Sequence, residues 1–208
     1  SVAAGGKRLR PILLMAAADA VGAKGSDFVA VAAGLEMIHT YSLIHDDLPS
    51  MDNDDYRRGR LTNHKVFGDA MALLAGDGLL TQAFEVMLEQ RGVDPKVLLE
   101  VVRLVAKCAG PTGMVGGQAL DITSEDQQLT LEQMKKLHEA KTGAMFVAAV
   151  RGGAMLGGAD PETLRIMTHF ANLFGLAFQI TDDILDVEGD AKVMGKPAHS
   201  DEKLHKST

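Results

Sequence analysis

The sequence predicts an all-α domain in which antiparallel helices form a bundle around a central substrate cavity. Ala, Leu, Met and Val dominate the composition, aromatic residues make up only 4% of it, and Trp is absent. Such a composition favours helix over sheet. Gly and Pro separate long stretches in which apolar residues recur three and four positions apart, whereas strand patterns are weak throughout. Because 46% of the 208 residues are hydrophobic, residues 1–208 can form a single domain with a buried core.

Each expected helix follows from local start and stop signals. The first spans Leu9–Val21, with Pro11 in its first turn, where proline is tolerated. The second spans Phe28–Asp47 and ends there because Pro49 disfavours helical geometry in the preceding residue. Further helices are expected over Ala70–Glu89, Pro95–Cys108, Leu131–Leu156 and Pro161–Val187. The glycine-rich segment Gly110–Gly117 is expected to form a kink or a tight packing point.

Charge and cysteine content exclude several classes of function. The formal net charge of −7, without basic residues interleaved with aromatic ones, argues against nucleic-acid binding. Cys108 is the only cysteine, so the sequence predicts no disulfide framework and is compatible with the cytoplasm. No uninterrupted apolar run reaches the ~20 residues of a membrane span, so we expect no stable membrane anchor.

Two aspartate clusters lie far apart in the sequence, each within apolar surroundings. The first, Asp46–Asp55, contains five carboxylates, and the second, Asp182–Asp186, contains three. Two unit charges ~4 Å apart repel by ~4 kcal/mol at an effective dielectric of ~20, so such clusters need water or cations. Carboxylate oxygens are hard ligands that suit Mg²⁺, Ca²⁺ or Mn²⁺. Each cluster alone could be a solvated acidic face, but the two together favour a metal site.

The spacing within each cluster supports this interpretation. Asp182 and Asp186 are four residues apart and therefore share one face of a helix. Asp46 and Asp52 are separated by Pro49, where the chain can fold back and bring both side chains to one cation. An EF-hand beginning at Asp52 is excluded, because its sixth position is Arg57 instead of Gly.

Basic residues occur in two further segments. Lys7 and Arg10 are three residues apart near the start of the chain, and Arg57 and Arg58 directly follow the first aspartate cluster. Taken alone, such pairs are most often surface charges. Beside two carboxylate clusters, they predict a polyphosphate site in which metals bind one phosphate group and cationic side chains bind another.

These motifs together resemble the trans-isoprenyl diphosphate synthase family. The two aspartate clusters are similar to the two aspartate-rich motifs of that family. The remaining matches follow in the family's order, over nearly the whole chain: Gly5–Pro11, Arg57–Arg58, Gly117–Asp121, Lys141–Thr142 and Phe178–Gln179. The resemblance implies the isoprenoid synthase fold, a homodimer, and about three Mg²⁺ ions, with Mn²⁺ as an alternative.

The implied activity is head-to-tail prenyl transfer. An allylic diphosphate, dimethylallyl or geranyl, would ionise with the help of Mg²⁺. Isopentenyl diphosphate would attack the resulting cation, and loss of a proton, taken up by the released diphosphate, would restore the alkene. Preorganised electrostatic stabilisation of the developing charge would lower the barrier.

The resemblance also implies roles for single residues. Mg²⁺ would be bound by Asp46, Asp52 and Asp182, with Asp47, Asp121 and Asp186 in support. The allylic diphosphate would be held by Arg57, Lys141, Lys196 and Lys206, and isopentenyl diphosphate by Lys7, Arg10, His39 and Arg58, with Gly6 and Phe178 also at the substrates. Thr142 and Gln179 would place oxygen dipoles near the allylic cation, so that Arg57, Lys141, Thr142 and Gln179 form the catalytic set.

Three of these residues, His39, Gln118 and Asp121, have competing interpretations. A lone histidine on an apolar helix is usually structural, but His39 lies seven residues before Asp46 and so shares its helical face. We therefore expect His39 to contact substrate. Gln118 and Asp121 could instead cap or bridge helices, and His138, like His64, is expected to be structural.

Tyr41 and Ser42 are the candidates for control of product length. Tyr41 lies five residues before Asp46, ~7.5 Å down the helix axis, where its ring could close the floor of the cavity, while Ser42 leaves room. An aromatic residue at this position resembles the bacterial type of farnesyl diphosphate synthase. The alternative is that Tyr41 is an ordinary core residue.

Several alternatives remain open. Family members normally have further helices before Ser1 and after Thr208, so we expect a chain truncated at both ends, with the loop Gly189–Thr208 ordered by substrate. The product could instead be geranyl or geranylgeranyl diphosphate. A class I terpene cyclase would leave Lys7, Arg10 and Arg58 without a role, and a non-catalytic partner subunit would not require both aspartate clusters.

Overall fold

The computed structural model describes residues 1–125 and 127–188 and confirms the all-α prediction. The helices are η1 Val2–Ala4, α1 Leu9–Ala20, η2 Gly25–Phe28, α2 Val29–Asp46, α3 Asn63–Phe67, α4 Asp69–Leu88, α5 Pro95–Ala109, α6 Met114–Thr123, α7 Leu131–His138, η3 Glu139–Gly143, α8 Ala144–Leu156 and α9 Pro161–Glu188. The strands β1 Tyr56–Arg57 and β2 Arg60–Leu61 pair antiparallel in a short hairpin.

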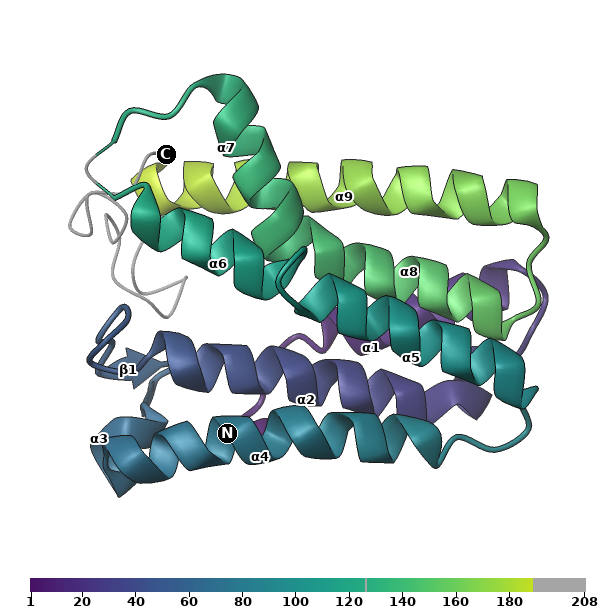
Figure 1. Ribbon diagram of the computed structural model, residues 1–208, viewed down its shortest axis with the longest axis horizontal. Coiled ribbons are helices and arrows are strands. Elements are labelled where there is room, and N and C mark those ends of the chain that lie inside the picture. The colour runs from purple at the N-terminus through teal and green to yellow at the C-terminus, as the bar shows by residue number, and fades with distance from the viewer. Residues whose placement is uncertain (126, 189–208) are drawn as a thin grey trace.

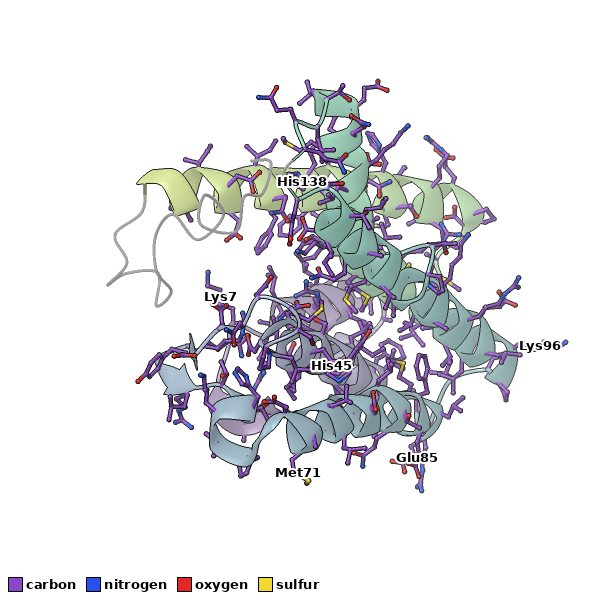
Figure 2. The ribbon with its side chains drawn as sticks, turned by 60° about the vertical axis from the view of Figure 1, so that its left-hand side comes forward. Lys7, His45, Met71, Glu85, Lys96 and His138 are labelled. Atoms are coloured by element: carbon purple, nitrogen blue, oxygen red, sulfur yellow. The ribbon has the colours of Figure 1, made fainter. Side chains whose placement is uncertain are left out.

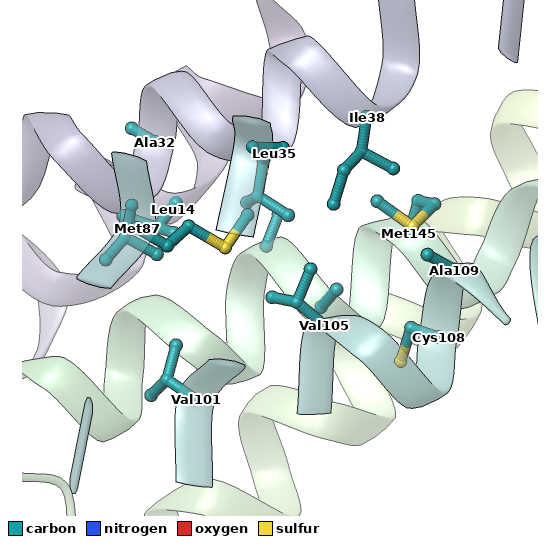
Figure 3. Packing of buried hydrophobic residues seen from close by; sticks show 14 of the residues in the cluster. Leu14, Ala32, Leu35, Ile38, Met87, Val101, Val105, Cys108, Ala109 and Met145 are labelled. Carbon is teal, nitrogen blue, oxygen red and sulfur yellow. The ribbon is translucent and has the colours of Figure 1, made fainter. Parts of the chain in front are cut away.

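The long helices pack in two layers. Helices α2 and α4 run antiparallel, side by side in one layer, and α5, α6, α8 and α9 form the other (Figure 1). Helix α1 packs against both α2 and α8 and so joins the layers. Side chains such as Leu14, Leu35 and Ile38 meet Val105 and Met145 in a fully buried core between them (Figure 3).

The helix boundaries agree with the predicted ones to within two residues, with three exceptions. The glycine-rich segment at 110–117 ends α5 and begins α6, a helix that the sequence analysis did not predict. The short helix α3 and the β1–β2 hairpin were not predicted either. The expected helix over 131–156 contains a π-helical turn, η3, between α7 and α8.

The hairpin owes its shape to a two-residue turn. Arg58 and Gly59 have φ values of 54° and 72°, and positive φ at both central residues is typical of the type I′ turn that suits the twist of antiparallel strands. Glycine adopts this backbone freely, whereas an arginine there costs ~1 kcal/mol or more. The turn places Arg57 and Arg58 next to each other at the tip of the hairpin.

The π-helical turn η3 is packed between two glycines from neighbouring helices. A Cβ atom on Gly117 of α6 would lie 2.3 Å from the backbone nitrogen of Lys141. A Cβ atom on Gly175 of α9 would lie 2.9 Å from the Cα of Gly143. Any side chain at either position would force the helices apart, so both glycines are needed for α6 and α9 to lie this close to η3. Such π-helical turns occur frequently at functional sites.

In the described part of the chain, two helical segments are long and apolar enough to cross a membrane, judged by length and composition alone. They are Gly25–Asp46 and Asp69–Leu88. The first is largely packed inside the domain as a core element, and the second exposes much of its surface. Core helices of globular proteins pass the same test, so this finding is weak support for a membrane span.

We predict that Gly117→Ala lowers the free energy of unfolding by about 1–3 kcal/mol, because the new methyl group would overlap the backbone at Lys141. Urea denaturation measures the change. Gly78→Ala is the matched control: it lies in α4 with no atom near the added Cβ, so helix propensity should stabilise it by up to ~1 kcal/mol. Equal effects of the two substitutions would contradict the proposed close packing of α6 on η3.

Candidate active site

A cleft of about 1110 Å³ opens between the two layers and collects the predicted motifs. The C-terminal ends of α2, α6 and α9 lie at the same end of the molecule, on the left in Figure 1, close to the hairpin. In Figure 2, Lys7 belongs to the lower part of the molecule and His138 to the upper part, and both line the cleft. Segments that are far apart in sequence therefore supply its opposite walls.

Carboxylates from three helix ends line this cleft. Asp46 is the last residue of α2 and Asp52 follows in the next turn, whereas Asp121 lies in the last turn of α6 and Asp182 near the end of α9. Negative charge near a helix C-terminus is unfavourable, because the helix dipole already places partial negative charge there. Over residues 1–125 and 127–185, no three His, Cys, Asp or Glu side chains are close enough to form a complete metal site. The carboxylates that line the cleft come from helices of both layers.

The chemistry of this donor set fits a hard divalent cation. Burial raises the pKa of the Asp46 carboxyl to about 6, with Lys141 opposing the shift and Asp52 adding to it. A buried carboxylate that faces other carboxylates is stabilised by a cation. Residues Asp46, Asp52 and Asp182 thus have the oxygen ligands that Mg²⁺ prefers, and the ion's remaining positions would be taken by water or phosphate.

Asp47 occupies a different position from Asp46. Its side chain is buried and does not line the cleft. One oxygen, Oδ1, accepts a hydrogen bond from Nε of Arg57 at 2.7 Å and forms an ion pair with Nη2 at 2.6 Å. The arginine lies in turn 3.7 Å from Asp54. Although the sequence analysis placed Asp47 with the metal ligands, the geometry makes it the residue that holds Arg57 against the cleft wall.

Basic side chains form the wall opposite the second aspartate motif. Five of them line the cleft, from the segment before α1, the first turn of α1 and the hairpin: Lys7, Arg8, Arg10, Arg57 and Arg58. Arg8 pairs with Glu36 at 2.5 Å, and Arg58 donates a hydrogen bond to the carbonyl oxygen of Gly5. These contacts hold the N-terminal segment against the hairpin tip, so that two sequence-distant basic motifs meet.

His39 lies among these cations. Burial first, and then the positive charges of Arg10 and Arg58, lower the pKa of its imidazole to about 3. His39 is therefore neutral at physiological pH and can donate or accept a hydrogen bond without adding charge. Burial also lowers the pKa of Arg10 to about 10, against the attraction of Glu36. Its Nε is buried and has no hydrogen-bond partner among the described residues, and its guanidinium lies 5.1 Å from the centre of the Phe146 ring.

The π-helical turn supplies the upper wall. Lys141 Nζ donates to Asp121 Oδ2 at 2.5 Å, and the hydroxyl of Thr142 donates to Oε1 of Gln179 at 2.8 Å. Gln179 Nε2 donates to Asp183 at 3.1 Å. Because the turn widens here, two successive side chains, Lys141 and Thr142, both line the cleft and contact different helices.

Tyr41 and His45 line the cleft where α2 packs against α4. Tyr41 is 6% exposed, and its ring packs at a right angle to that of His45 with 5.6 Å between the ring centres. His45 Nε2 lies 3.0 Å from the carbonyl oxygen of Leu73, and Gly76 leaves the space that the imidazole fills. Ser42 also lines the cleft, with its hydroxyl bonded to the carbonyl oxygen of His39 at 3.0 Å.

The cleft brings together most of the predicted site residues. They are Gly6, Lys7, Arg10, His39, Tyr41, Ser42, Asp46, Asp52, Arg57, Arg58, Asp121, Lys141, Thr142, Phe178, Gln179 and Asp182. Asp186 lies in α9, but its side chain is beyond the last one that the structure describes. Lys196 and Lys206 lie outside the described residues.

His138 and Asp183 are among the lining residues that were not predicted as site residues. His138 was expected to be structural, yet it lines the cleft, with Nε2 3.9 Å from Asp183 Oδ2. Asp183 lines the cleft as well. The signal in the sequence was weak: His138 precedes Lys141 by three residues, and Asp183 follows Gln179 by four, spacings that place each pair on one helical face.

Comparison with known proteins places the chain in a family. The model of the polyprenyl synthetase family matches residues 1–208. The farnesyl diphosphate synthase of Geobacillus stearothermophilus is 53% identical over 210 aligned positions, which cover 100% of this chain and 71% of that protein. The farnesyl diphosphate synthase of Bacillus subtilis is 47% identical with the same coverage. The chain belongs to the polyprenyl synthetase family.

A solved structure supports the fold. The geranyltransferase of Helicobacter pylori, in complex with magnesium and isoprenyl diphosphate, superimposes with a TM-score of 0.90 at 36% sequence identity. The match covers 99% of this chain and 69% of that one.

We predict that Asp46→Asn removes a pH dependence of stability. The pKa of Asp46 is about 6 in the folded protein instead of 3.8, so between these values the folded state binds more protons than the unfolded state. Without divalent cations, the free energy of unfolding should therefore fall as pH rises through this window, by at most about 3 kcal/mol. The measurement is urea denaturation from pH 3.5 to pH 7.5, a range of roughly four units that spans the shift.

The Asp46→Asn variant also tests whether Asp46 binds a divalent cation. At neutral pH, added Mg²⁺ should raise the unfolding temperature of the unsubstituted protein and should do so less in Asp46→Asn. Glu85→Gln, on the exposed face of α4, is the control and should behave like the unsubstituted protein in both measurements. An Asp46→Asn variant that retains the full pH slope would show that burial of this carboxyl does not cause it.

Proposed function

We propose that this protein is a Mg²⁺-dependent prenyltransferase that condenses dimethylallyl or geranyl diphosphate with isopentenyl diphosphate, releasing farnesyl diphosphate and diphosphate. The single observation that carries this proposal is the charge arrangement of the cleft. Carboxylates at the ends of α2, α6 and α9 line one cavity together with five cationic side chains from the N-terminal segment, α1 and the hairpin, and with apolar side chains such as Tyr41, Leu43 and Leu73. The names of the relatives, farnesyl diphosphate synthases at 47–53% identity, agree with it.

The carboxylates would hold the metal. Asp46 and Asp52 on one wall and Asp182 on the other would bind about three Mg²⁺ ions, with Mn²⁺ as a possible replacement. Bound Mg²⁺ would neutralise the charge that develops on the diphosphate leaving group. Lys141, held by Asp121, and Arg57, held by Asp47, would bind the oxygens of the allylic diphosphate. Lys196, Lys206 and Asp186 remain predicted contributors.

The basic wall would bind the second substrate. Lys7, Arg10 and Arg58 would bind isopentenyl diphosphate through charge-assisted hydrogen bonds, and the neutral His39 would add a hydrogen bond. Arg10 is already largely desolvated, and its Nε has no partner in residues 1–125 and 127–188, so a diphosphate oxygen would satisfy a buried donor. Diphosphates bound at the two walls would place their hydrocarbon chains together in the cleft.

The oxygens of Thr142 and Gln179 would lie along the path of the allylic cation and stabilise its positive charge. After the new carbon–carbon bond forms, the proton lost from the adduct would pass to the released diphosphate. We further propose that the protein acts as a homodimer in the cytoplasm without a membrane anchor, as expected for the family.

Incubation of the full-length protein with Mg²⁺, isopentenyl diphosphate and geranyl diphosphate tests this function. We expect farnesyl diphosphate as the product, identified by chromatography, and loss of product in Asp46→Ala. Cyclised or merely hydrolysed product would identify a terpene cyclase instead. Folded protein without turnover would identify a non-catalytic subunit.

We predict that Tyr41→Ala lengthens the product, because the ring that closes the cleft floor would be removed. Chain-length analysis should show geranylgeranyl and longer diphosphates at the expense of farnesyl diphosphate. Tyr56→Ala is the control, since that tyrosine is exposed in the hairpin and should leave the product distribution unchanged. An unaltered distribution in Tyr41→Ala would contradict a role of the ring in chain length.

A further inference from the structure

A chain of polar contacts connects the π-helical turn with α9 at the cleft wall. Thr142 Oγ1 donates to Gln179 Oε1 at 2.8 Å, and Gln179 Nε2 donates to Asp183 Oδ1 at 3.1 Å. The other oxygen of Asp183 lies 3.9 Å from Nε2 of His138. All four residues line the cleft, and the roles described above account only for Thr142 and Gln179.

The direction of these hydrogen bonds follows from the chemistry of the groups. An ionised carboxylate accepts hydrogen bonds and donates none, so the amide of Gln179 must turn its NH₂ group toward Asp183. Its oxygen then faces Thr142. The threonine hydroxyl has one proton, which it donates to that oxygen, so its own lone pairs stay available on the cleft side. Asp183 therefore decides which end of the Gln179 amide faces the reacting groups.

His138 lies at the far side of Asp183, with Nε2 3.9 Å from Oδ2. Its side chain is 9% exposed and that of Asp183 is 21% exposed, so both are largely shielded from water. His138 is the last residue of α7, directly before the π-helical turn that carries Thr142. Each oxygen of Asp183 thus faces a different neighbour, Gln179 on its own helix and His138 on the opposite one. This arrangement differs from that of the adjacent Asp182, which the proposed function assigns to metal.

We propose that Asp183 and His138 are positioning residues that keep the Gln179 amide oriented with its oxygen, and never its NH₂ group, toward Thr142 and the allylic cation. This inference rests on the proposed prenyl transfer. If the Gln179 amide were inverted, its NH₂ group, the positive end of the dipole, would lie beside the developing carbocation. The Thr142 hydroxyl would also lose Oε1 as its hydrogen-bond acceptor. The loss would affect the transition state more than the bound diphosphates, since these bind to other side chains.

A pair of substitutions tests the orientation directly. In Asp183→Asn, two amides face each other and nothing fixes their direction, so kcat should fall by about 10–100-fold, with KM for both substrates nearly unchanged. In Gln179→Glu, two carboxylates face each other and kcat should fall at least as far. In the double variant, the amide introduced at position 183 can donate to the carboxylate introduced at position 179, and a carboxylate oxygen again faces Thr142. We expect the double variant to recover to within about tenfold of the unsubstituted enzyme.

Binding provides a readout that does not depend on turnover. Calorimetry would compare an unreactive allylic thiodiphosphate with an analogue that carries an ammonium group at the cationic carbon. The unsubstituted protein should bind the ammonium analogue more tightly than the thiodiphosphate. In Asp183→Asn this ratio of affinities should fall by about 10-fold or more, and in the double variant it should recover. His138→Leu should lower the preference in the same direction.

Two outcomes would overturn the inference. A double variant no better than Asp183→Asn, with circular dichroism and unfolding temperature showing a folded protein, would exclude a role in amide orientation. A rise in the Mg²⁺ concentration needed for half-maximal activity in Asp183→Asn would make Asp183 a metal ligand. Glu162→Gln, which removes an exposed ion pair with Arg165 at the other end of α9, is the matched control and should leave both readouts unchanged. Absence of prenyl transfer in the unsubstituted enzyme would refute the proposed function itself.

Discussion

The close approach of α6 and α9 to the π-helical turn is the packing constraint on which the site depends. Gly117 and Gly175 let two helix backbones reach this turn from different sides. Only at that distance can Asp121 of α6 contact Lys141, and Gln179 of α9 contact Thr142. The turn itself widens the helix by one residue, which lets neighbouring side chains face different partners. In a regular α-helix through the same segment, either Lys141 or Thr142 would point away from its partner.

Charge separation across the cleft is the second organising feature. The cationic wall is partly neutralised by residues behind it: Glu36 binds Arg8, and Asp47 binds Arg57. On the acidic side, Lys141 binds Asp121, whereas burial raises the pKa of Asp46. Burial therefore disfavours the charge of Asp46 on the acidic side and that of Arg10 on the basic side. A ligand that combines divalent cations with diphosphate relieves both conditions at once.

Helix α2 connects the charged part of the cleft to its apolar part. Helix α2 carries His39 on the basic wall, Asp46 at the acidic mouth and Tyr41 at the deep end. Its position is set by close contact with α4, where His45 fills the space beside Gly76 and reaches the carbonyl of Leu73. The distance between diphosphate binding and the floor of the cleft is therefore set within one rigid element. This geometry suits an enzyme that measures a growing hydrocarbon chain from a fixed charged end.

The sequence by itself determined the helices and the types of charge at the site, because both depend on local spacing. Apolar periodicity and Pro49 were sufficient to predict α2 and α9, and the aspartate clusters and basic segments predicted residues that line one cleft. Only the tertiary structure decided that the neighbours Asp46 and Asp47 face different ways, one into the cleft and one toward Arg57. It also decided that Asp183 and His138, 45 residues apart by their numbers, face each other at the cleft wall. The reason is that one residue along a helix rotates a side chain by ~100°, and which direction meets a partner depends on helices that lie far away in the sequence.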